Sequence, residues 1–500
     1  MELKIIEITP TELEFGGVVG KSTDPKAGLR EAGPFDMRFG AAQLKEVRVG
    51  LVGTPDMNSK AIHWINRCQN FIPTAMKNFK QYPDFDGFEA IFRAKLLLNP
   101  IWEYTVNQEE LNNALAIEDS FDRFEKVLFL FSTGIEKLAD SETTKPNVVI
   151  CALPESILEA CRNVERKLSR PQKKIATKAV ANSKVGIQLS LFDQPTIDNA
   201  EDLLYRDFRR ALKAKAILAK MPIQIGRDNL FLDSPDNQDA ATRAWNSCVT
   251  LYYKAGGIPW RLKNNGLETC FVGVTFHHLR TTNKAVVKSC LAQGFSSEGE
   301  GFALRGGDVE QNAEPNGRNK VPHLSEKQAY DLGIKIIKEY AYRTGMNPQR
   351  IVMHKTSIFN EAEENGFRAA FSSIPIVELI NLLPTSFMLL KHSSYPVNRG
   401  TLCIVKDSYY YLFNTGYIKE IGTYPGPHIP RPIEIRSNEP LDIERAAEDI
   451  LALARMNWNT SSITGGDPVT LFFSRQLGGI MSELKTKQME NLPTSFRYYI

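Results

Sequence analysis

The stretch KAGGIPWRLKNNGLETCFVGVTFHHLR, residues 254–280, decides how the rest of the chain is interpreted. A Gly-Gly-Ile-Pro-Trp turn at Gly256–Trp260 is followed by a polar loop and then by the apolar, β-branched run Thr269–His277. Because such a run between turn residues is typical of a buried strand, we expect a core strand there. The turn before it predicts a boundary between two domains, at residues 1–257 and 258–500.

The composition is that of an ordinary globular protein. Of 500 residues, 42% are hydrophobic and 24% are charged, and this length is too great for one core, so two or three domains are expected. The formal net charge is only +3, which does not by itself indicate a polyanionic partner. A nucleic-acid site would therefore depend on local clustering of basic residues.

Cysteine usage and the absence of targeting signals indicate a cytoplasmic chain. The seven cysteines form no Cys-X-X-Cys pair, and most lie in apolar runs, as reduced core residues do. The N-terminal sequence MELKIIEITPTELEF has no basic segment followed by an apolar one, so no signal peptide is expected. No apolar run reaches the roughly 20 residues of a membrane-spanning helix, so no membrane contact is expected.

The order of elements predicts an α/β protein. Strand–turn–helix units recur in the first half, and the second half indicates a mixed sheet with crossover helices. Strands are expected at Val47–Gly53, Asn147–Leu153, Met221–Ile225, Thr269–His277, Ala285–Gln293, Arg350–His354, Ile376–Ile380, Ser386–His392, Thr401–Lys406 and Tyr409–Asn414. Helices are expected at Ser59–Phe71, Phe121–Ala139, Pro154–Leu168, Ala200–Lys220, Asp239–Ala255, Ser325–Thr344, Asp442–Ala454 and Val469–Leu484.

Basic residues cluster locally in spite of the small net charge. One predicted helix carries Arg209 and Lys213 four residues apart, hence on one face, opposite an apolar stripe. A later predicted helix presents Asn246 and Lys254 on one face, two turns apart. Residues 162–184 contain eight basic residues and one acid. That segment is either a solvated surface loop or a mobile basic arm beside a phosphate chain.

Seven stretches occur in the order found in the MID–PIWI half of Argonaute proteins, and together they resemble it over roughly residues 30–500. They are the basic helix followed by Gln224, then KAGGIPW, FVGVTF, RIVMHKTS, YPVNRGTLCIVKDSYYYLFNTGY, PHIPRPIEI and DPVTLFFSRQLGGIM. The chain has no room for N-terminal and PAZ domains, so it resembles the short prokaryotic Argonautes. The resemblance implies a Rossmann-like MID domain with an N-terminal lead-in segment (1–257), followed by an RNase H-like PIWI domain (258–500).

The resemblance also implies an inactive nuclease centre. PIWI domains are similar to RNase H, whose acidic residues hold two divalent ions across the scissile phosphate. At the positions of the family's first two aspartates this sequence has Thr275 and Thr356, and Ser474 falls in the region of the last ligand. Hydroxyls are neutral and are poor ligands for hard divalent cations beside carboxylates, so no cleavage is expected.

The alternative is an active RNase H-class endonuclease whose acidic residues lie elsewhere. Asp308, Glu310 and Asp331 are the candidates for such a set. The loop containing Glu298 and Glu300 could supply the family's mobile glutamate, but alone it cannot hold two metal ions.

A phosphate pocket is implied in the first domain. By resemblance, the guide's 5′-phosphate is surrounded by basic and amide side chains, which suit charge-assisted and oriented bonds to phosphate oxygens. The matching residues here are Arg209, Lys213, Gln224, Asn246 and Lys254. The C-terminal carboxylate of Ile500, with Gln224, is expected to help bind a structural Mg²⁺ at this phosphate. The tail FRYYI is equally typical of a hydrophobic terminus that is simply buried.

The resemblance finally implies a role and partners. Such chains hold a short guide RNA, recognise complementary single-stranded DNA, and act in prokaryotic defence through a separate NAD-consuming protein. That partner carries an APAZ region with a TIR domain, or alternatively a Sir2 domain, and forms a heterodimer with the Argonaute chain. Assembly into higher oligomers on target binding is left open. The sequence itself does not distinguish guide RNA from guide DNA, nor TIR from Sir2.

Overall fold

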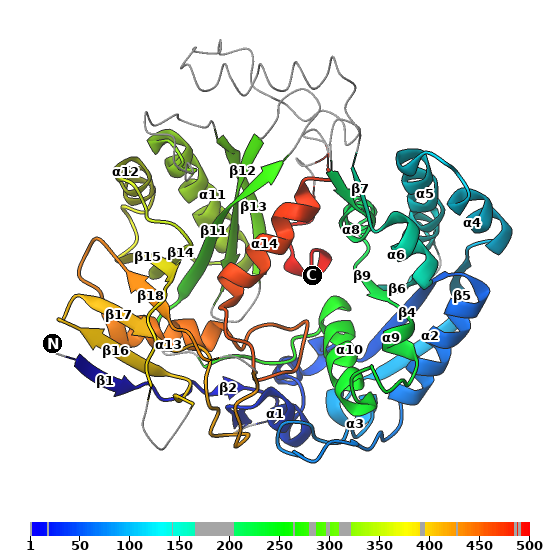
Figure 1. Cartoon of the computed structure of the whole chain (residues 1–500), viewed down its shortest axis with the longest axis horizontal. Helices are drawn as coiled ribbons and strands as arrows, with labels where there is room; N and C mark the ends of the chain where they lie inside the picture. The colour runs from blue at the N-terminus through cyan, green and yellow to red at the C-terminus, as the bar shows by residue number, and fades with distance from the viewer. Residues whose placement is uncertain are drawn as a thin grey trace, which may run out of the picture.

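Two main β-sheets form the framework of the computed structural model (Figure 1). It describes residues 3–17, 20–142, 144–165, 205–263, 266–279, 287–296, 301–309, 322–390, 396–426, 429–484, 488 and 492–500. The smaller sheet lies in the first half of the chain, and the larger one is built mainly from the second half. The predicted α/β class is confirmed.

The smaller sheet has four parallel strands in the order β5-β4-β6-β9. Their bounds are β4 Glu46–Gly53, β5 Lys95–Thr105, β6 Val148–Ala152 and β9 Ile223–Gly226. Because parallel strands require crossover connections, helices cover both faces, as in a Rossmann-like unit. One face packs on α2 (Pro55–Cys68), α3 (Phe88–Phe92) and α10 (Ala240–Lys254), and the other on α4 (Gln108–Leu115), α5 (Ser120–Ala139), α6 (Glu155–Cys161) and α8 (Phe208–Leu218).

The larger sheet has nine strands in the order β1-β16-β17-β18-β15-β14-β11-β12-β13. Strand β11, third from one edge, pairs in parallel with β14 and antiparallel with β12, the arrangement of an RNase H-like core. The bounds are β1 Leu3–Glu7, β11 Thr269–Leu279, β12 Val287–Phe295, β13 Gly301–Val309, β14 Arg350–Lys355, β15 Ile376–Pro384, β16 Thr401–Val405, β17 Tyr409–Leu412 and β18 Ile433–Arg436.

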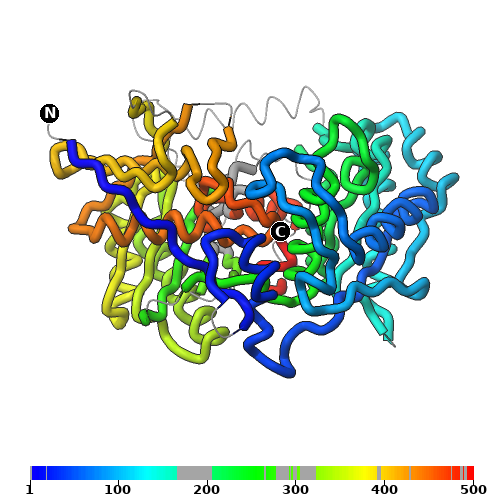
Figure 2. The backbone as a smooth tube through the Cα atoms, turned by 90° about the horizontal axis from the view of Figure 1, so that it is seen from below, coloured from blue at the N-terminus to red at the C-terminus, as the bar shows by residue number. Residues whose placement is uncertain are grey.

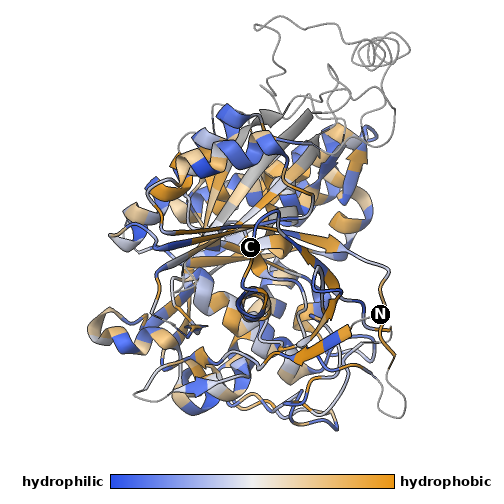
Figure 3. Ribbon diagram, turned by 90° about the vertical axis from the view of Figure 1, so that its left-hand side faces the viewer, coloured by the Kyte–Doolittle hydropathy of each residue, from blue (hydrophilic) through white to orange (hydrophobic). Residues whose placement is uncertain are grey.

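Helices also cover both faces of the larger sheet. On one face lie α11 (Glu326–Thr344) and α12 (Glu361–Ala370), and on the other α13 (Ile443–Leu453) and α14 (Val469–Met481). The strands between these layers are mainly hydrophobic (Figure 3). One core cluster joins the α13–α14 face to α2 and α10 of the smaller unit. The two halves are therefore packed through a continuous apolar core.

The first strand does not belong with the smaller sheet. Over its whole length β1 pairs antiparallel with β16, at the edge of the larger sheet (Figures 1 and 2). The short β2 (Leu13–Glu14) pairs with β10 (Arg261–Leu262) and β3 (Lys21–Ser22). The N-terminal lead-in segment of the predicted 1–257 unit therefore contributes a strand to the larger sheet.

Several element bounds differ from the sequence-based expectation. The helix expected at 200–220 begins at Phe208, because Tyr205–Asp207 form strand β8 beside β7 (Asn163–Glu165). The strand expected at 386–392 is absent from the described residues 385–390, where Phe387 stacks on Tyr411 instead. None of the described helices is long and apolar enough to cross a membrane. The basic segment 162–184 lies outside the described residues from 166 onward.

Candidate nucleic-acid interface

Helix α8 presents two cations toward the centre of the molecule. Asp207 caps the helix by accepting a hydrogen bond from the Arg210 backbone amide at 3.0 Å. The buried side chains Phe208 and Leu212 anchor it on the core of the smaller unit. Arg209 is exposed and Lys213 is half-buried one turn later, so their charged groups share one face of the helix, as predicted.

Lys254 and Gln224 form the second side of the same pocket. Lys254 ends helix α10 and is only 1% exposed. Its Nζ donates to the Ile223 carbonyl and to Gln224 Oε1, both at 2.7 Å. These bonds fix a buried ammonium group against the end of β9. The cluster is thus built from a helix face, a helix end and a strand.

The three cations lie close enough to repel one another. Burial, and then the charge of Arg209, lower the pKa of Lys213 to about 8. Burial also lowers the pKa of Lys254 well below its ordinary value, and Lys213 and Arg209 lower it further. Within the described residues, no carboxylate is ion-paired with any of the three. A bound anion would offset this repulsion, so the cluster is a candidate anion site.

The C-terminus reaches this pocket. The Lys213 Nζ lies 3.5 Å from the Tyr499 carbonyl oxygen, and the Tyr499 hydroxyl donates to the Pro493 carbonyl at 2.8 Å. Ile500 is 2% exposed within the apolar core (the C mark in Figure 2 shows its central place). The tail is therefore both a buried hydrophobic terminus and a neighbour of the pocket, so neither of the two sequence-based interpretations excludes the other.

The structure does not bring the Asn246 side chain into the cation cluster. Its Oδ1 accepts bonds from the Thr460 hydroxyl at 2.9 Å and from the Ser461 amide and hydroxyl at 3.0 and 3.1 Å. The side chain thus fixes a loop of the second half against α10. Asn246 and Lys254 do lie on the same helix, as predicted. Helical spacing alone, however, does not show which residues donate hydrogen bonds to the Asn246 amide oxygen.

The two threonines of the predicted degenerate centre come together. In the parallel ladder Val274 is opposite Lys355, so Thr275 and Thr356 are the next residues along the two strands. Thr275 follows Phe271 and Gly273 at a spacing of two, which places it on the α14 face of the sheet. Ser474 lies one turn after Thr470 in α14, but its side chain is outside the described set. The α14 face of the sheet thus carries the Thr275 hydroxyl, and Thr356 follows directly after the end of β14.

Helix α14 approaches this face unusually closely. A Cβ on Gly273 would lie 1.8 Å from the Thr470 carbonyl oxygen, so only glycine permits the contact. The Thr470 hydroxyl is 2.9 Å from His354 Nδ1, and burial, then the charge of Arg350, lower the pKa of His354 to about 3. His354 is therefore neutral at ordinary pH.

Of the alternative acidic residues, only Asp331 is described, and it lies exposed on α11, on the opposite side of the sheet from α14. Glu298, Glu300 and Glu310 lie outside the described residues, as does the side chain of Asp308. Among the described residues there is no group of three His, Cys, Asp or Glu side chains arranged to hold a metal ion.

Comparisons with known proteins bear on this architecture. A scan against known protein families finds no match, and no curated protein matches the chain. Solved structures do match. Clostridium butyricum Argonaute, bound to a guide DNA with a 5′ deoxycytidine and a 19-mer target DNA, superimposes with a TM-score of 0.58 at 13% identity. Aa-Ago with externally bound siRNA superimposes with a TM-score of 0.56 at 13% identity.

This is an Argonaute fold. The two matches cover 100% and 99% of this chain but 55% and 56% of the other chains, so the chain spans about half their length. Within this fold, the smaller sheet and its helices correspond to the MID-like unit and the larger sheet to the PIWI-like unit.

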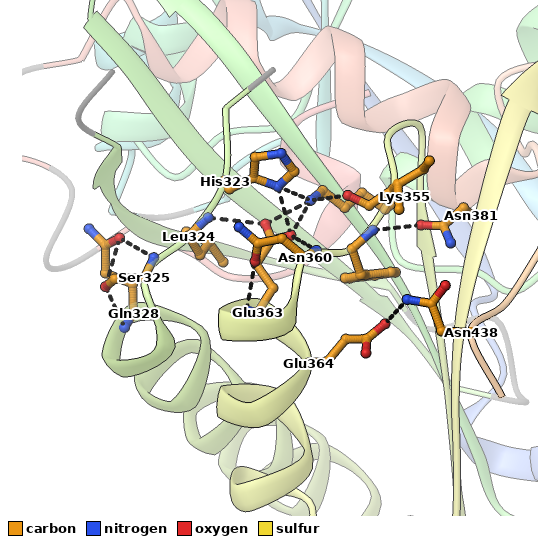
Figure 4. Close-up of polar contacts among 12 residues, drawn as sticks. His323, Leu324, Ser325, Gln328, Lys355, Asn360, Glu363, Glu364, Asn381 and Asn438 are labelled. Carbon is orange, nitrogen blue, oxygen red and sulfur yellow. Dashed lines mark hydrogen bonds and ion pairs between the residues drawn. The ribbon is translucent and has the colours of Figure 1, made fainter. Parts of the chain in front are cut away.

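An ionic network in the PIWI-like unit was not foreseen from the sequence (Figure 4). Lys355, at the end of β14, and Glu363, in α12, are both 1% exposed or less and pair at 2.7 Å. Glu363 also accepts from the Leu324 and Asn360 amides at 3.0 and 3.1 Å, and its second oxygen lies 3.0 Å from His323 Nδ1. Burial alone would raise the pKa of Glu363, but His323 and Lys355 lower it below its ordinary value. The network fixes the loop that carries Thr356.

A second buried ion pair joins the two units. Arg206, 4% exposed, donates through Nε to Glu483 at 2.7 Å and also pairs with Glu125 of α5. The Asp207 amide donates to the same Glu483 carboxylate at 3.2 Å. Because Glu483 follows α14, this contact ties the helix that touches β11 to the helix that carries Lys213.

Proposed function

We propose that this chain binds a short guide nucleic acid by its 5′-phosphate and captures a complementary single strand. One observation carries the proposal: Arg209, Lys213 and Lys254 converge around Gln224 without an ion-paired carboxylate in the described part of the chain. A terminal phosphate offers two charges and oxygens that can accept from all three cations. Such a site selects strand ends over internal phosphates, which carry one charge each.

The Argonaute fold supports this assignment. The Clostridium butyricum neighbour was solved with a guide DNA and a target DNA. By analogy with other guided systems, pairing would supply sequence specificity here while the protein reads backbone shape and charge. Guide RNA and target single-stranded DNA follow from the resemblance of the sequence to short prokaryotic Argonautes.

We further propose that the chain does not cut its target. Two-metal hydrolysis needs several anionic ligands, and Thr275 and Thr356, which follow the last residue pair of the β11–β14 ladder, offer neutral hydroxyls. The output of target binding would then be a change passed to another protein. We propose a TIR-APAZ protein as that partner, in a cytoplasmic defence complex in which the partner consumes NAD. A Sir2-APAZ partner remains the alternative.

The donor set fits a Mg²⁺ at the guide phosphate only in part. The Gln224 amide oxygen already accepts from the Lys254 ammonium, which makes Gln224 a poor ligand. The buried C-terminal carboxylate of Ile500 is the remaining anionic donor, and guide phosphate oxygens would complete the coordination. The metal would supply charge neutralisation where the guide backbone meets the tail. Chelation by EDTA is then expected to weaken binding of a 5′-phosphorylated guide more than that of a 5′-hydroxyl guide.

The decisive experiment compares two guides that differ only in the 5′ group. Fluorescence anisotropy would give the affinities of both guides for the wild-type chain and for the variant Arg209→Ala/Lys213→Ala. Two charge-assisted contacts are worth roughly 3–6 kcal/mol before compensation by neighbours, so the preference for the 5′-phosphate should collapse. Lys254 is left unchanged because its buried bonds to Ile223 and Gln224 also support the fold.

The matched control is Lys215→Ala, which removes an exposed cation from the same helix. It should leave the preference intact. Equal losses for both guides in the double variant would show that these residues contact only the general backbone, and the proposal would fail.

A further inference from the structure

A separate cavity of about 760 Å³ lies in the connection between β17 and β18. Its lining includes Arg399, Thr415, Tyr424, Ile429, Arg431 and Thr464. None of these residues belongs to the 5′-phosphate pocket, and none of them is acidic. The volume is within the usual range of small-molecule sites, about 300–1,000 Å³.

Arg399 gives the cavity a half-buried positive charge. Its guanidinium donates to the Ile463 and Gly465 carbonyls, the latter at 2.8 Å, while its Nε is buried without a hydrogen-bond partner in the described structure. Carbonyl oxygens orient the group but do not neutralise it. Burial, and then the charge of Arg455, lower the pKa of Arg399 to about 9.

The local charge balance is positive. The Glu420 carboxylate acts on Arg399 and is itself ion-paired with Arg455 at 3.2 Å. It only partly offsets Arg399. Arg431 adds an exposed second cation to the cavity wall. Two guanidinium groups that line the same cavity are suited to phosphate, because each can donate two parallel hydrogen bonds to phosphate oxygens.

The remaining wall is apolar and aromatic. Ile429 and Tyr424 offer surfaces on which a flat base or a sugar can pack, and Thr415 and Thr464 add polar side chains to the lining. Gly416, with φ of 146°, has no side chain because a Cβ would lie 2.3 Å from the Val397 carbonyl oxygen.

We infer that this cavity binds a nucleoside phosphate, with the phosphate at Arg399 and Arg431 and the base against the apolar wall. The ligand is either a free mononucleotide or the terminal nucleotide of a bound strand, since both present the same chemistry. An acidic peptide would satisfy the arginines but would leave the apolar and aromatic wall without a matching group.

The test is calorimetric titration of the full chain with AMP. Because AMP also carries a 5′-phosphate, the wild type should bind two equivalents. Arg431→Glu should weaken one of the two sites by at least about tenfold, the scale of one lost charge-assisted contact, and leave the other. The variant Arg209→Ala/Lys213→Ala should weaken AMP binding at the Arg209/Lys213 cluster and leave binding at the cavity unchanged. Lys338→Glu on α11 makes the same charge change at an exposed distant position and should alter neither site.

The outcomes separate this inference from the proposed function. Loss of all AMP binding in the Arg209/Lys213 variant, or equal behaviour of Arg431→Glu and Lys338→Glu, would overturn the cavity assignment. Persistence of both sites in the Arg209/Lys213 variant would instead count against the 5′-phosphate pocket. Adenosine and inorganic phosphate should each bind the cavity more weakly than AMP. Equal binding of inorganic phosphate, or tighter binding of an oligoglutamate peptide, would contradict a nucleoside phosphate.

A second arm identifies the source of the nucleotide. An oligonucleotide with a 5′-hydroxyl and a 3′-phosphate is titrated into the same variants. If Arg431→Glu weakens this strand as it weakens AMP, a strand end occupies the cavity. If only AMP binding is weakened, the ligand is a free nucleotide. Since Arg431 is exposed, an unchanged unfolding midpoint would confirm that the variant is folded.

Discussion

The surroundings of Lys213 disfavour its positive charge, so phosphate binding by this residue should depend on pH. In the folded chain its pKa is lowered to about 8 by burial and by Arg209. Below that pH the lysine is positive and can pair with a phosphate; above it the proton is lost. Affinity for a 5′-phosphorylated strand should therefore fall as pH rises through about 8, more than for a 5′-hydroxyl strand. Anisotropy titrations from pH 7 to pH 9 would measure this.

The Lys213→Arg variant is the control, because arginine stays charged throughout this range. In this variant the affinity for the 5′-phosphorylated strand should fall with pH no more than the affinity for the 5′-hydroxyl strand.

The lowered pKa of Lys213 also affects the stability of the fold. Between about pH 8 and the ordinary value of 10.5 the unfolded chain binds more protons, so the free energy of unfolding should rise with pH across that window in the wild type. If the wild type and Lys213→Arg show the same dependence of affinity and of unfolding free energy on pH, a group other than Lys213 is responsible.

Gly273 should tolerate no side chain. Alanine there would place its Cβ 1.8 Å from the Thr470 carbonyl oxygen, which is backbone and cannot move without displacing α14. Overpacking of this kind typically costs about 1–3 kcal/mol or more, so the thermal unfolding midpoint of Gly273→Ala should fall. Gly465→Ala, whose nearest neighbour would be at 3.3 Å, is the matched control and should fall much less.

At the scale of elements, the end of β14 and the start of α12 depend on a buried ion pair. Removing only Lys355, as in Lys355→Met, leaves the Glu363 carboxylate buried and less compensated. Such a change typically costs about 3–5 kcal/mol, which a denaturant titration would detect. The double variant Lys355→Met/Glu363→Leu should recover part of this loss. A double variant less stable than the single one would show that the Glu363 carboxylate stabilises this loop mainly through its amide contacts.

Sequence patterns predicted elements best where one element shows its own periodicity. The apolar run around Val272 predicted β11, and an apolar run bounded by turn residues predicted β14. Both could be predicted because a strand that is buried on both faces is hydrophobic along its whole length. Strand β5 was missed, since Pro100 interrupts it and the ladder with β4 shifts register near Leu51. The pairing of β1 with β16 joins residues about 400 apart, and no local pattern records it.

The candidate site was partly predictable for the same reason. Arg209, Lys213, Gln224 and Lys254 were recognised from spacing and resemblance, and the structure brings them together. Asn246 has the right spacing but a different partner, because a loop from the other half of the chain reaches it. Such contacts depend on tertiary packing, which spacing within one helix cannot show.

For the molecule as a whole, we expect binding of nucleic acid without cleavage. Purified chain loaded with a guide should leave a complementary strand intact in Mn²⁺ or Mg²⁺, since Thr275 and Thr356 cannot replace the anionic ligands of a two-metal centre. Denaturing gels of an end-labelled target would check this. Cutting that persists unchanged in Thr275→Ala/Thr356→Ala would point to a contaminating nuclease. Cutting that is lost in that variant would show that this face is catalytic.

The most direct measurement is the 5′ end of the nucleic acid that copurifies with the chain. Short strands should be labelled by polynucleotide kinase only after a phosphatase has removed a 5′-phosphate, and the Arg209→Ala/Lys213→Ala variant should lose that enrichment while Lys215→Ala keeps it. Strands that label equally without phosphatase, or an enrichment that survives in the double variant, would contradict a pocket built to hold a terminal phosphate.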